Sequence, residues 1–349
     1  MNRQHEAIWR LGSFFRLPLF GWSLSLPLIG GLTVPGGMST RLTVALIIAA
    51  PFHVVLCVLN DLADIELDRG DPRKAGRPLV SGAVSPKTAT IVVVVAAILP
   101  FVLDPVSLGL SGRRWFVLLV AFIATAVYNV KGKRARIPPL MDLSQGIGAG
   151  AFVLYSAMVV SGPTWITWGA CISVVLFIVL LNGAHAGLRD LTSDYAFGAR
   201  TTPIFFGARP GDNGPTIPGR FSIYIWLLEG TFIVTASLWI ALALMRSTSY
   251  WSSAIAMGIF VIGSLGSLYL ALDSSRSMER RYLAAGVQML CGVGCITTVA
   301  TIRFGGIVSV GILAVVLIPL AVKRIARAIR VIWRAGHAEA QEDSVRSRI

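Results

Sequence analysis

Aspartates gather in two short stretches of a chain that is otherwise poor in charged residues. The first stretch holds Asp61, Asp64 and Asp68, and the second holds Asp190 and Asp194. Their spacings place each set on one face of a helix, where like charges repel one another. Carboxylate oxygens arranged in this way suit Mg²⁺, which keeps water and substrate phosphate oxygens among its ligands. The two stretches therefore predict a magnesium site.

Basic residues accompany both aspartate stretches. They are Arg69, Arg73, Lys74 and Arg77 after the first stretch, and Arg189 and Arg200 around the second. Acidic and basic groups in one place are typical of a phosphate bound with metal ions, because the cations contact the phosphate oxygens that the metal leaves free. We therefore expect a diphosphate here. Glu66, Asp71 and Lys74 are the members of these stretches that are also compatible with a solvated loop.

The composition excludes an ordinary soluble protein. Of 349 residues, 55% are hydrophobic and only 14% are charged, against about 25% charged residues in a typical soluble domain. A membrane-spanning helix needs about 20 apolar residues, and the sequence has ten candidate runs. They lie at 14–33, 42–59, 86–104, 115–130, 139–160, 164–184, 221–245, 251–272, 282–302 and 304–322.

These runs predict an all-α fold, a polytopic transmembrane bundle of nine to ten spans. The loops after the second and sixth spans carry the aspartate stretches and are expected to cap one end of it. Residues 1–322 form a single bundle in this interpretation, and residues 323–349 form a basic cytoplasmic tail. The start of this tail has interleaved basic and apolar residues, which are compatible with a helix on the membrane surface or with a frayed end.

The distribution of basic residues predicts the orientation. With the N-terminus in the cytoplasm, ten spans leave nearly all of the 31 Lys and Arg residues on the cytoplasmic side, as inserted proteins do. The exceptions are Arg41, Arg113, Arg114, Arg246 and Arg303. Both aspartate stretches then face the cytoplasm. The net charge of +14 is explained by these loops, and no nucleic-acid partner is expected. The preference for Arg over Lys is typical of a GC-rich bacterium. The membrane is therefore expected to be a bacterial inner membrane.

The motifs taken together resemble those of the UbiA superfamily of intramembrane prenyltransferases. The first family motif is matched by NDLADIELD from Asn60 to Asp68, with RPLVSG from Arg77 to Gly82. The second is matched by DLTSD from Asp190 to Asp194, with Gly198, Arg200 and Thr201 after it. The third family feature is an aromatic residue followed by basic residues after the fourth span. The segment YNVKGKR, from Tyr128 to Arg134, resembles it. The resemblance covers roughly residues 14–300.

The resemblance implies a bundle, usually of nine spans, that encloses a chamber. Family members use Mg²⁺ to bind and ionise a polyprenyl diphosphate and transfer the prenyl group to a small acceptor, commonly an aromatic ring or quinone precursor. The implied metal ligands are Asp61, Asp64, Asp68, Asp190 and Asp194, oriented by Asn60. The implied diphosphate contacts are Arg77, Arg200 and Lys131. The tenth apolar run departs from the family pattern.

Five residues outside the aspartate stretches also belong to the candidate site or its alternatives. Tyr128 and Lys131 follow the fourth span, where a basic residue just past a helix end can reach a phosphate, and Lys133 is nearly equivalent to Lys131. Asp142 lies near the start of the fifth span, where it could orient an acceptor hydroxyl or accept its proton. A hydrogen bond to a neighbouring helix is the alternative for Asp142. Arg16 is compatible with a phosphate contact or with a topological anchor.

Two other functions remain open from the sequence. A membrane terpene cyclase would use the same aspartates without an external acceptor. A cation-coupled transporter would also bind ions with paired carboxylates, but its site is expected near the middle of the membrane, and both aspartate stretches lie at one face. The prenyl chain length and the acceptor are not indicated by any motif.

Overall fold

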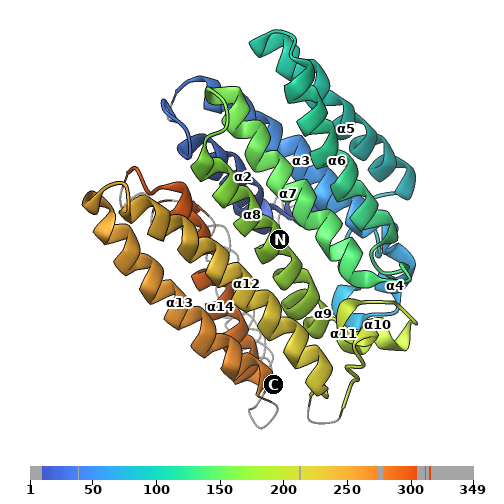
Figure 1. Ribbon diagram of the computed structural model, residues 1–349. Helices are drawn as coiled ribbons and strands as arrows, with labels where there is room; N and C mark the ends of the chain where they lie inside the picture. Colours follow the sequence, from blue (N-terminus) through green and yellow to red (C-terminus); the bar gives the residue numbers. More distant parts are fainter. Residues whose placement is uncertain are drawn as a thin grey trace, which may run out of the picture.

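The computed structural model describes residues 10–37, 39–211, 214–273 and 278–304, with 311 and 314–315. Within these residues eight helices are long and apolar enough to cross a membrane, and a shorter apolar helical segment, Leu17–Leu32, makes a ninth. The helices are α2 (Phe20–Leu32), α3 (Arg41–Ala63), α5 (Pro86–Leu108), α6 (Gly112–Lys131), α7 (Pro138–Val160), α8 (Trp165–Leu180), α12 (Gly219–Leu244), α13 (Trp251–Leu272) and α14 (Met278–Ala300). They form one bundle (Figure 1).

This bundle confirms the all-α transmembrane fold. The nine described helices correspond to the first nine predicted spans. The tenth predicted span, at 304–322, and the basic tail, at 323–349, lie almost entirely outside the described residues. The protein is therefore an integral, multi-pass membrane protein by length and composition of its helices.

The position of a helix in the bundle follows from which of its faces carry large apolar side chains and which carry small residues. Helix α5 exposes large apolar side chains such as Ile91, Ile98 and Val102, which is the expected surface toward lipid because the bilayer core is itself apolar. Helix α7 is instead mostly buried. Gly30 of α2 lies so close to the α7 backbone that an added Cβ would be 2.1 Å from the carbonyl oxygen of Val153. These two helices therefore pack backbone to backbone.

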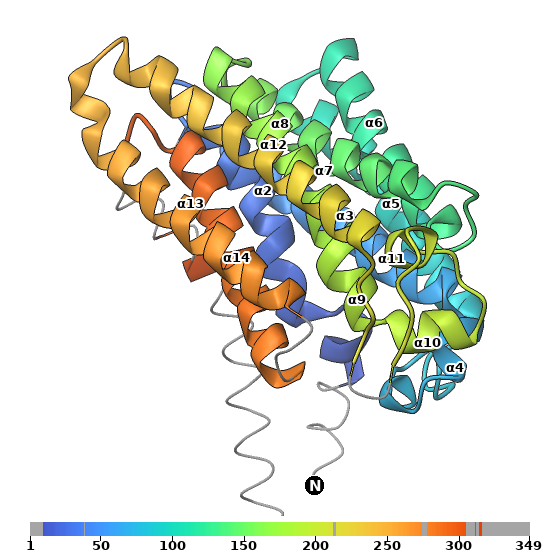
Figure 2. The ribbon, with the colours of Figure 1, turned by 60° about the horizontal axis from the view of Figure 1, so that its bottom comes forward.

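Short helices cover one end of the bundle, which we call the motif end. They are α4 (Ile65–Arg69), α9 (Gly187–Arg189), α10 (Leu191–Ala196) and α11 (Thr202–Phe205), and the turn Pro72–Lys74 follows α4. Figures 1 and 2 show α4, α10 and α11 gathered at that end. They come from the segments after α3 and α8, as expected for loops after the second and sixth spans.

Toward the opposite end, an ion pair joins α5, α6 and α7. Asp104 of α5 is fully buried, and its carboxylate accepts hydrogen bonds from Arg114 at 3.1 Å and from the hydroxyl of Tyr155 at 2.9 Å. Arg114 also donates to the carbonyl oxygen of Gly109 at 2.5 Å. A charge buried in this way persists because its partners replace the water it has lost.

We expect Asp104→Ala to destabilise the protein strongly, because it leaves the guanidinium of Arg114 without its carboxylate. Breaking one partner of a buried pair costs about 3–5 kcal/mol. The measurement is thermal unfolding of the purified protein in detergent. Glu66→Ala is the control, because it breaks an exposed pair with Arg69 and such pairs contribute about 0–1 kcal/mol. Equal melting temperatures for the two variants would contradict the prediction.

Candidate active site

Each aspartate motif interrupts its helix at an aspartate. Asp64 lies between α3 and α4 with φ −96° and ψ 5°, and Asp190 lies between α9 and α10 with φ −98° and ψ 4°. After each break the chain resumes in the same way: the amide of Asp68 donates to the carbonyl of Asp64 at 2.8 Å, and that of Asp194 to Asp190 at 2.9 Å. The two motifs thus share one local backbone conformation, which the helical spacing alone did not predict.

Cations neutralise the first motif. Arg16 donates to both carboxylate oxygens of Asp61, and Arg77 donates to Asp61 at 2.9 Å and to Asp68 at 2.5 Å. Lys74 completes the set with a bond of 2.6 Å to Asp68. Arg16 has a left-handed backbone, with φ 48°, which costs a non-glycine residue about 1–2 kcal/mol. Its pairing with Asp61 offsets this strain.

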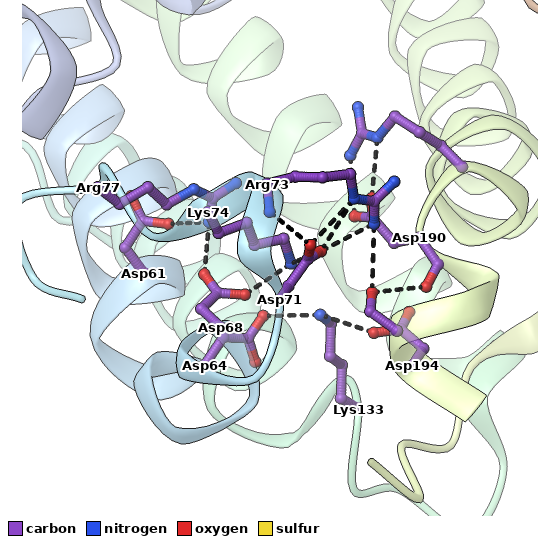
Figure 3. Close-up of polar contacts among 12 residues, drawn as sticks. Asp61, Asp64, Asp68, Asp71, Arg73, Lys74, Arg77, Lys133, Asp190 and Asp194 are labelled. Atoms are coloured by element: carbon purple, nitrogen blue, oxygen red, sulfur yellow. Dashed lines mark hydrogen bonds and ion pairs between the residues drawn. The ribbon is translucent and has the colours of Figure 1, made fainter. Parts of the chain in front are cut away.

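A single lysine connects the two motifs. The Nζ atom of Lys133 lies 3.1 Å from a carboxylate oxygen of Asp64 and 3.1 Å from one of Asp194 (Figure 3). Asp190 is paired with its neighbour Arg189 through two bonds of 3.1 Å. Lys133 follows α6, so the segment after the fourth span lies between the two aspartate motifs.

The pKa values in this cluster follow from burial and charge. Burial raises the pKa of Asp64 and of Asp194, and the shared ammonium of Lys133 only partly opposes it. Burial alone would lower the pKa of Lys133, but the two carboxylates together raise it. Burial would also raise the pKa of Asp190, but the bonds from Arg189 bring this pKa below its usual value. One cation shared by two carboxylates, as at Asp64 and Asp194, thus opposes the effect of burial on the pKa less than a cation that pairs with one carboxylate, as at Asp190.

Close backbone contacts hold the capping segments together. The ring of Phe197, after α10, lies directly against Gly70, where an added Cβ would be 1.8 Å from it. The amide of Arg200 donates to the carbonyl of Lys133 at 2.7 Å. Arg73 reaches Ser193 at 3.5 Å. The segments after α3, α6 and α8 therefore meet directly over the site.

Asp71 lies in the cap, and its environment differs from that of Glu66. Its side chain is buried, accepts a bond from the backbone amide of Arg73 at 3.0 Å, and pairs with that arginine's guanidinium at 2.8 Å. These bonds from Arg73 lower the pKa of Asp71 to about 2. Glu66 is exposed and pairs only with Arg69 among the contacts described. Asp71 thus fastens the turn that holds Lys74.

The structure places the other predicted site residues unequally. Asp142 is buried and accepts a bond of 2.5 Å from the hydroxyl of Thr202, which is the neighbouring-segment hydrogen bond that the sequence left open. Tyr128 is half-buried in the last turn of α6. These residues lie around the motif end.

Three predicted residues make weaker connections to the cluster. The side chains of Lys131 and Arg200 are exposed, and Asn60 is half-buried, with its carbonyl accepting the amide of Asp64. Lys133, which the spacing did not separate from Lys131, is the lysine that bridges the motifs. Lys74, compatible from sequence with a solvated loop, is buried against Asp68. Only the fold distinguishes these alternatives.

The donor chemistry of the cluster suits magnesium. All five motif aspartates offer oxygen ligands. Among the described residues, no three histidine, cysteine, aspartate or glutamate side chains lie close enough to hold a metal by themselves. Mg²⁺ is usually bound by one or two carboxylates and takes its remaining ligands from water and substrate phosphates. The residues present therefore fit an ion that is shared with a phosphorylated ligand.

A cavity lies inside the bundle between the motif end and the buried rings of its middle. The residues that line it are Trp22, Ser23, Leu26, Phe52, Leu56, Thr125, Gln145, Ala149 and Ile178. Most are apolar, but Gln145 accepts a bond from Asn182, and the buried hydroxyl of Thr125 has no hydrogen-bond partner among the described residues. The cavity is therefore small, mostly apolar and partly open.

Comparison with known sequences relates the chain to a protein family and to named enzymes. The chain matches the model of the UbiA prenyltransferase family over residues 24–285. It is 27% identical over 232 residues to a 4-hydroxybenzoate octaprenyltransferase of Polynucleobacter asymbioticus, covering 65% of this chain and 71% of that protein. It is also 27% identical to a 4-hydroxybenzoate solanesyltransferase of Synechocystis, covering 59% of this chain and 64% of that one.

Solved structures share the fold at lower identity. A UbiA homologue from Aeropyrum pernix superimposes with a TM-score of 0.63 at 16% identity, over 80% of this chain and 96% of that one. A UbiA homologue from Archaeoglobus fulgidus, bound to GPP and Mg²⁺, gives a TM-score of 0.54 at 15% identity, over 89% and 99%. The family model spans most of the chain and includes both aspartate motifs and the Lys133 bridge, so this chain belongs to the UbiA prenyltransferase family.

Proposed function

We propose that this protein ionises a polyprenyl diphosphate with Mg²⁺ and transfers the prenyl group to a small acceptor, an aromatic ring or quinone precursor. The observation that carries the proposal is the meeting of two aspartate motifs across Lys133, at the end of a bundle that also contains a mostly apolar cavity. Carboxylates alone would need only counter-ions, but carboxylates, surrounding arginines and an apolar cavity together match a substrate with a charged head and an apolar tail.

Charge is the basis of the proposed ionisation. Mg²⁺ held by Asp61, Asp64, Asp68, Asp190 and Asp194, with Asn60 orienting them, would neutralise the negative charge that grows on the departing diphosphate. Arg77, Lys133 and Lys74 already lie among these carboxylates and are placed to donate hydrogen bonds to the diphosphate oxygens. Arg200, Lys131 and Tyr128 are the further contacts that we propose for the diphosphate.

The cavity protects the allylic cation that is left behind. Its wall includes the rings of Trp22 and Phe52, and an aromatic face stabilises a desolvated cation by about 2 kcal/mol. Asp142 is buried beside the motif end, where its carboxylate can accept the proton that the acceptor releases when its new carbon bond forms. The bond that breaks is the C–O bond to the diphosphate, which leaves with its counter-ions.

The comparisons support the same reaction class. The named relatives are 4-hydroxybenzoate polyprenyltransferases, and one solved relative is bound to GPP and Mg²⁺. We propose that the motif end faces the cytoplasm of a bacterial inner membrane, because the loops there carry most of the basic residues. The bilayer is the remaining partner, since an isoprenoid tail reaches the enzyme from the lipid.

The first experiment measures diphosphate release from membranes that contain the protein, with geranyl, farnesyl and geranylgeranyl diphosphates, with Mg²⁺ or EDTA, and with or without aromatic acceptors. We expect Mg²⁺-dependent release and a prenylated product, and a loss of about a hundredfold or more in Asp64→Asn and Asp194→Asn, the scale on which one preorganised electrostatic contact acts. Glu66→Gln is the matched control and keeps its activity.

Other outcomes of this experiment decide between the alternatives. Release without acceptor, together with a cyclic hydrocarbon or alcohol, would make the protein a terpene cyclase. Absence of both release and diphosphate binding would contradict the proposal. A transporter is disfavoured because both motifs occupy the same end of the bundle (Figure 2).

The two lysines after α6 give a second prediction. We expect Lys133→Ala to lower turnover at least about tenfold, because a hydrogen bond to a charged group contributes about 1.5–3 kcal/mol. Lys131→Ala is the comparison, since its exposed side chain bridges no carboxylates among the described residues, and we expect a smaller loss than in Lys133→Ala. The initial rate of diphosphate release at saturating Mg²⁺ is the measurement. A larger loss in Lys131→Ala would reverse the assignment.

A further inference from the structure

A histidine inside the bundle connects α3 to the chain around the start of α2. His53 belongs to α3, and its side chain has an exposed fraction of 2%. Its Nε2 atom lies 2.8 Å from the carbonyl oxygen of Phe15, and its Nδ1 atom lies 2.8 Å from the hydroxyl of Ser23. Both ring nitrogens are therefore hydrogen-bonded, although His53 belongs to neither aspartate motif.

The partners of His53 determine which nitrogen carries the proton. A carbonyl oxygen can only accept, so Nε2 donates to Phe15, and in the neutral ring Nδ1 accepts from the hydroxyl of Ser23. The ring of Phe20 packs against the imidazole, with centroids 5.2 Å apart. His53 thus contacts the chain both before and after Arg16.

The backbone of Arg16 needs support of this kind. Among the described residues it is the only non-glycine residue with a positive φ, at 48°, and such a conformation persists where the surrounding structure fixes it. On one side, the carbonyl of Arg16 accepts the amide of Leu19 at 2.8 Å. On the other side, His53 holds the carbonyl of the peptide that joins Phe15 to Arg16. The orientation of that peptide sets the φ angle of Arg16.

Arg16 reaches the first aspartate motif from this position. Its Nε atom donates to Asp61 at 2.9 Å, and its Nη2 atom donates to the other oxygen of the same carboxylate. His53 and Asp61 lie eight residues apart in α3, which is about 12 Å along the helix axis. Two consecutive residues therefore contact α3 at two separate points: Phe15 through its backbone at His53, and Arg16 through its side chain at Asp61.

The position of the Arg16 guanidinium matters for the site because Asp61 also binds Arg77, and Arg77 binds Asp68. Electrostatic catalysis depends on charged groups that are already in place, and a displacement of about 1 Å can cost about a hundredfold in rate. We propose that His53 is a positioning residue for ionisation of the prenyl diphosphate, acting on Asp61 through the backbone and side chain of Arg16. The inference rests on the proposed function.

Two substitutions of His53 separate its bond to Phe15 from the rest of its packing. The amide of His53→Gln reaches the Nε2 position and can donate to the carbonyl of Phe15. The amide of His53→Asn is one carbon shorter, reaches only the Nδ1 position and can pair with Ser23. The measurement is kcat and KM for diphosphate release from farnesyl diphosphate with Mg²⁺ and 4-hydroxybenzoate. We expect kcat/KM to stay within about threefold of wild type in His53→Gln and to fall at least about fivefold in His53→Asn, because a buried carbonyl without its donor is costly.

A double-mutant cycle shows whether His53 acts through Arg16. Arg16→Met removes the guanidinium and keeps an apolar stem. If His53 acts by positioning that guanidinium, adding His53→Asn to Arg16→Met lowers kcat/KM by less than about twofold more, because the effects of coupled residues are not additive. A merely structural role of His53 would make the two losses multiply, and that result would overturn the proposal.

The matched control is Thr33→Val. Thr33 follows the last residue of α2, at the other end of that helix from Arg16, and its buried hydroxyl lies 2.7 Å from that of Thr167. The substitution therefore also removes a buried hydrogen bond between helices, but away from the motif end. We expect a lower melting temperature and an unchanged kcat/KM.

A binding measurement separates this inference from the proposed function. Inorganic pyrophosphate with Mg²⁺ undergoes no ionisation of a prenyl group, so its effect on the melting temperature of the purified protein reports binding alone. We expect stabilisation of the wild type and of His53→Gln, and a smaller stabilisation, of equal size, in His53→Asn, Arg16→Met and the double variant. This pattern without turnover of any prenyl donor would uphold the role of His53 and overturn the proposed reaction.

The remaining outcomes are also distinct. Turnover by the wild type, with His53→Asn equal to His53→Gln in kcat/KM and in stabilisation by pyrophosphate, would overturn the role of His53 and leave the proposed reaction intact. Absence of both turnover and stabilisation in the wild type would overturn both.

Discussion

Five aspartates at the end of an apolar bundle need opposite charge nearby, and the arrangement of the capping segments follows from that need. Arg16 comes from before α2, Arg77 and Lys74 from after α4, and Lys133 from after α6. Coulomb forces between these groups act at an effective dielectric well below that of water. Each segment therefore brings a charge to the cap, and apolar contacts such as that of Leu79 with Phe14 and Val58 add to its packing.

The bilayer imposes a second requirement on the bundle between its ends. Polar groups inside a membrane protein need partners from the protein itself. The structure meets this requirement in several places: Asp104 is paired at one end, the aspartate motifs at the other, and Glu229 of α12 accepts bonds from Ser264 and Gln288. The stacked rings of Phe52 and Phe152 leave the part of the interior around them apolar. An apolar interior beside a charged end suits an amphiphilic substrate, whose head and tail need opposite environments.

The sequence predicted most of the helices and less of the site. Apolar runs long enough to cross the membrane are independent of tertiary contacts, so nine of them appear as helices. The sequence did not predict the breaks at Asp64 and Asp190. A continuous helix and a helix interrupted at one residue place the aspartates in almost the same positions, so their spacing cannot distinguish the two. The choice of Lys133 over Lys131 depends on which side of the chain after α6 faces the cap. No local pattern contains that information.

The Lys133 bridge also bears on how the protein is assembled during synthesis. Chains emerge from the N-terminus onward, so Arg16, Lys74 and Arg77, the partners of Asp61 and Asp68, are all synthesised before α5. The bridging cation of Asp64 is synthesised only after α6, and Asp194 follows that cation in the chain. The first motif therefore has all of its cations only once the segment after α6 exists, whereas the second motif has its lysine available from the start.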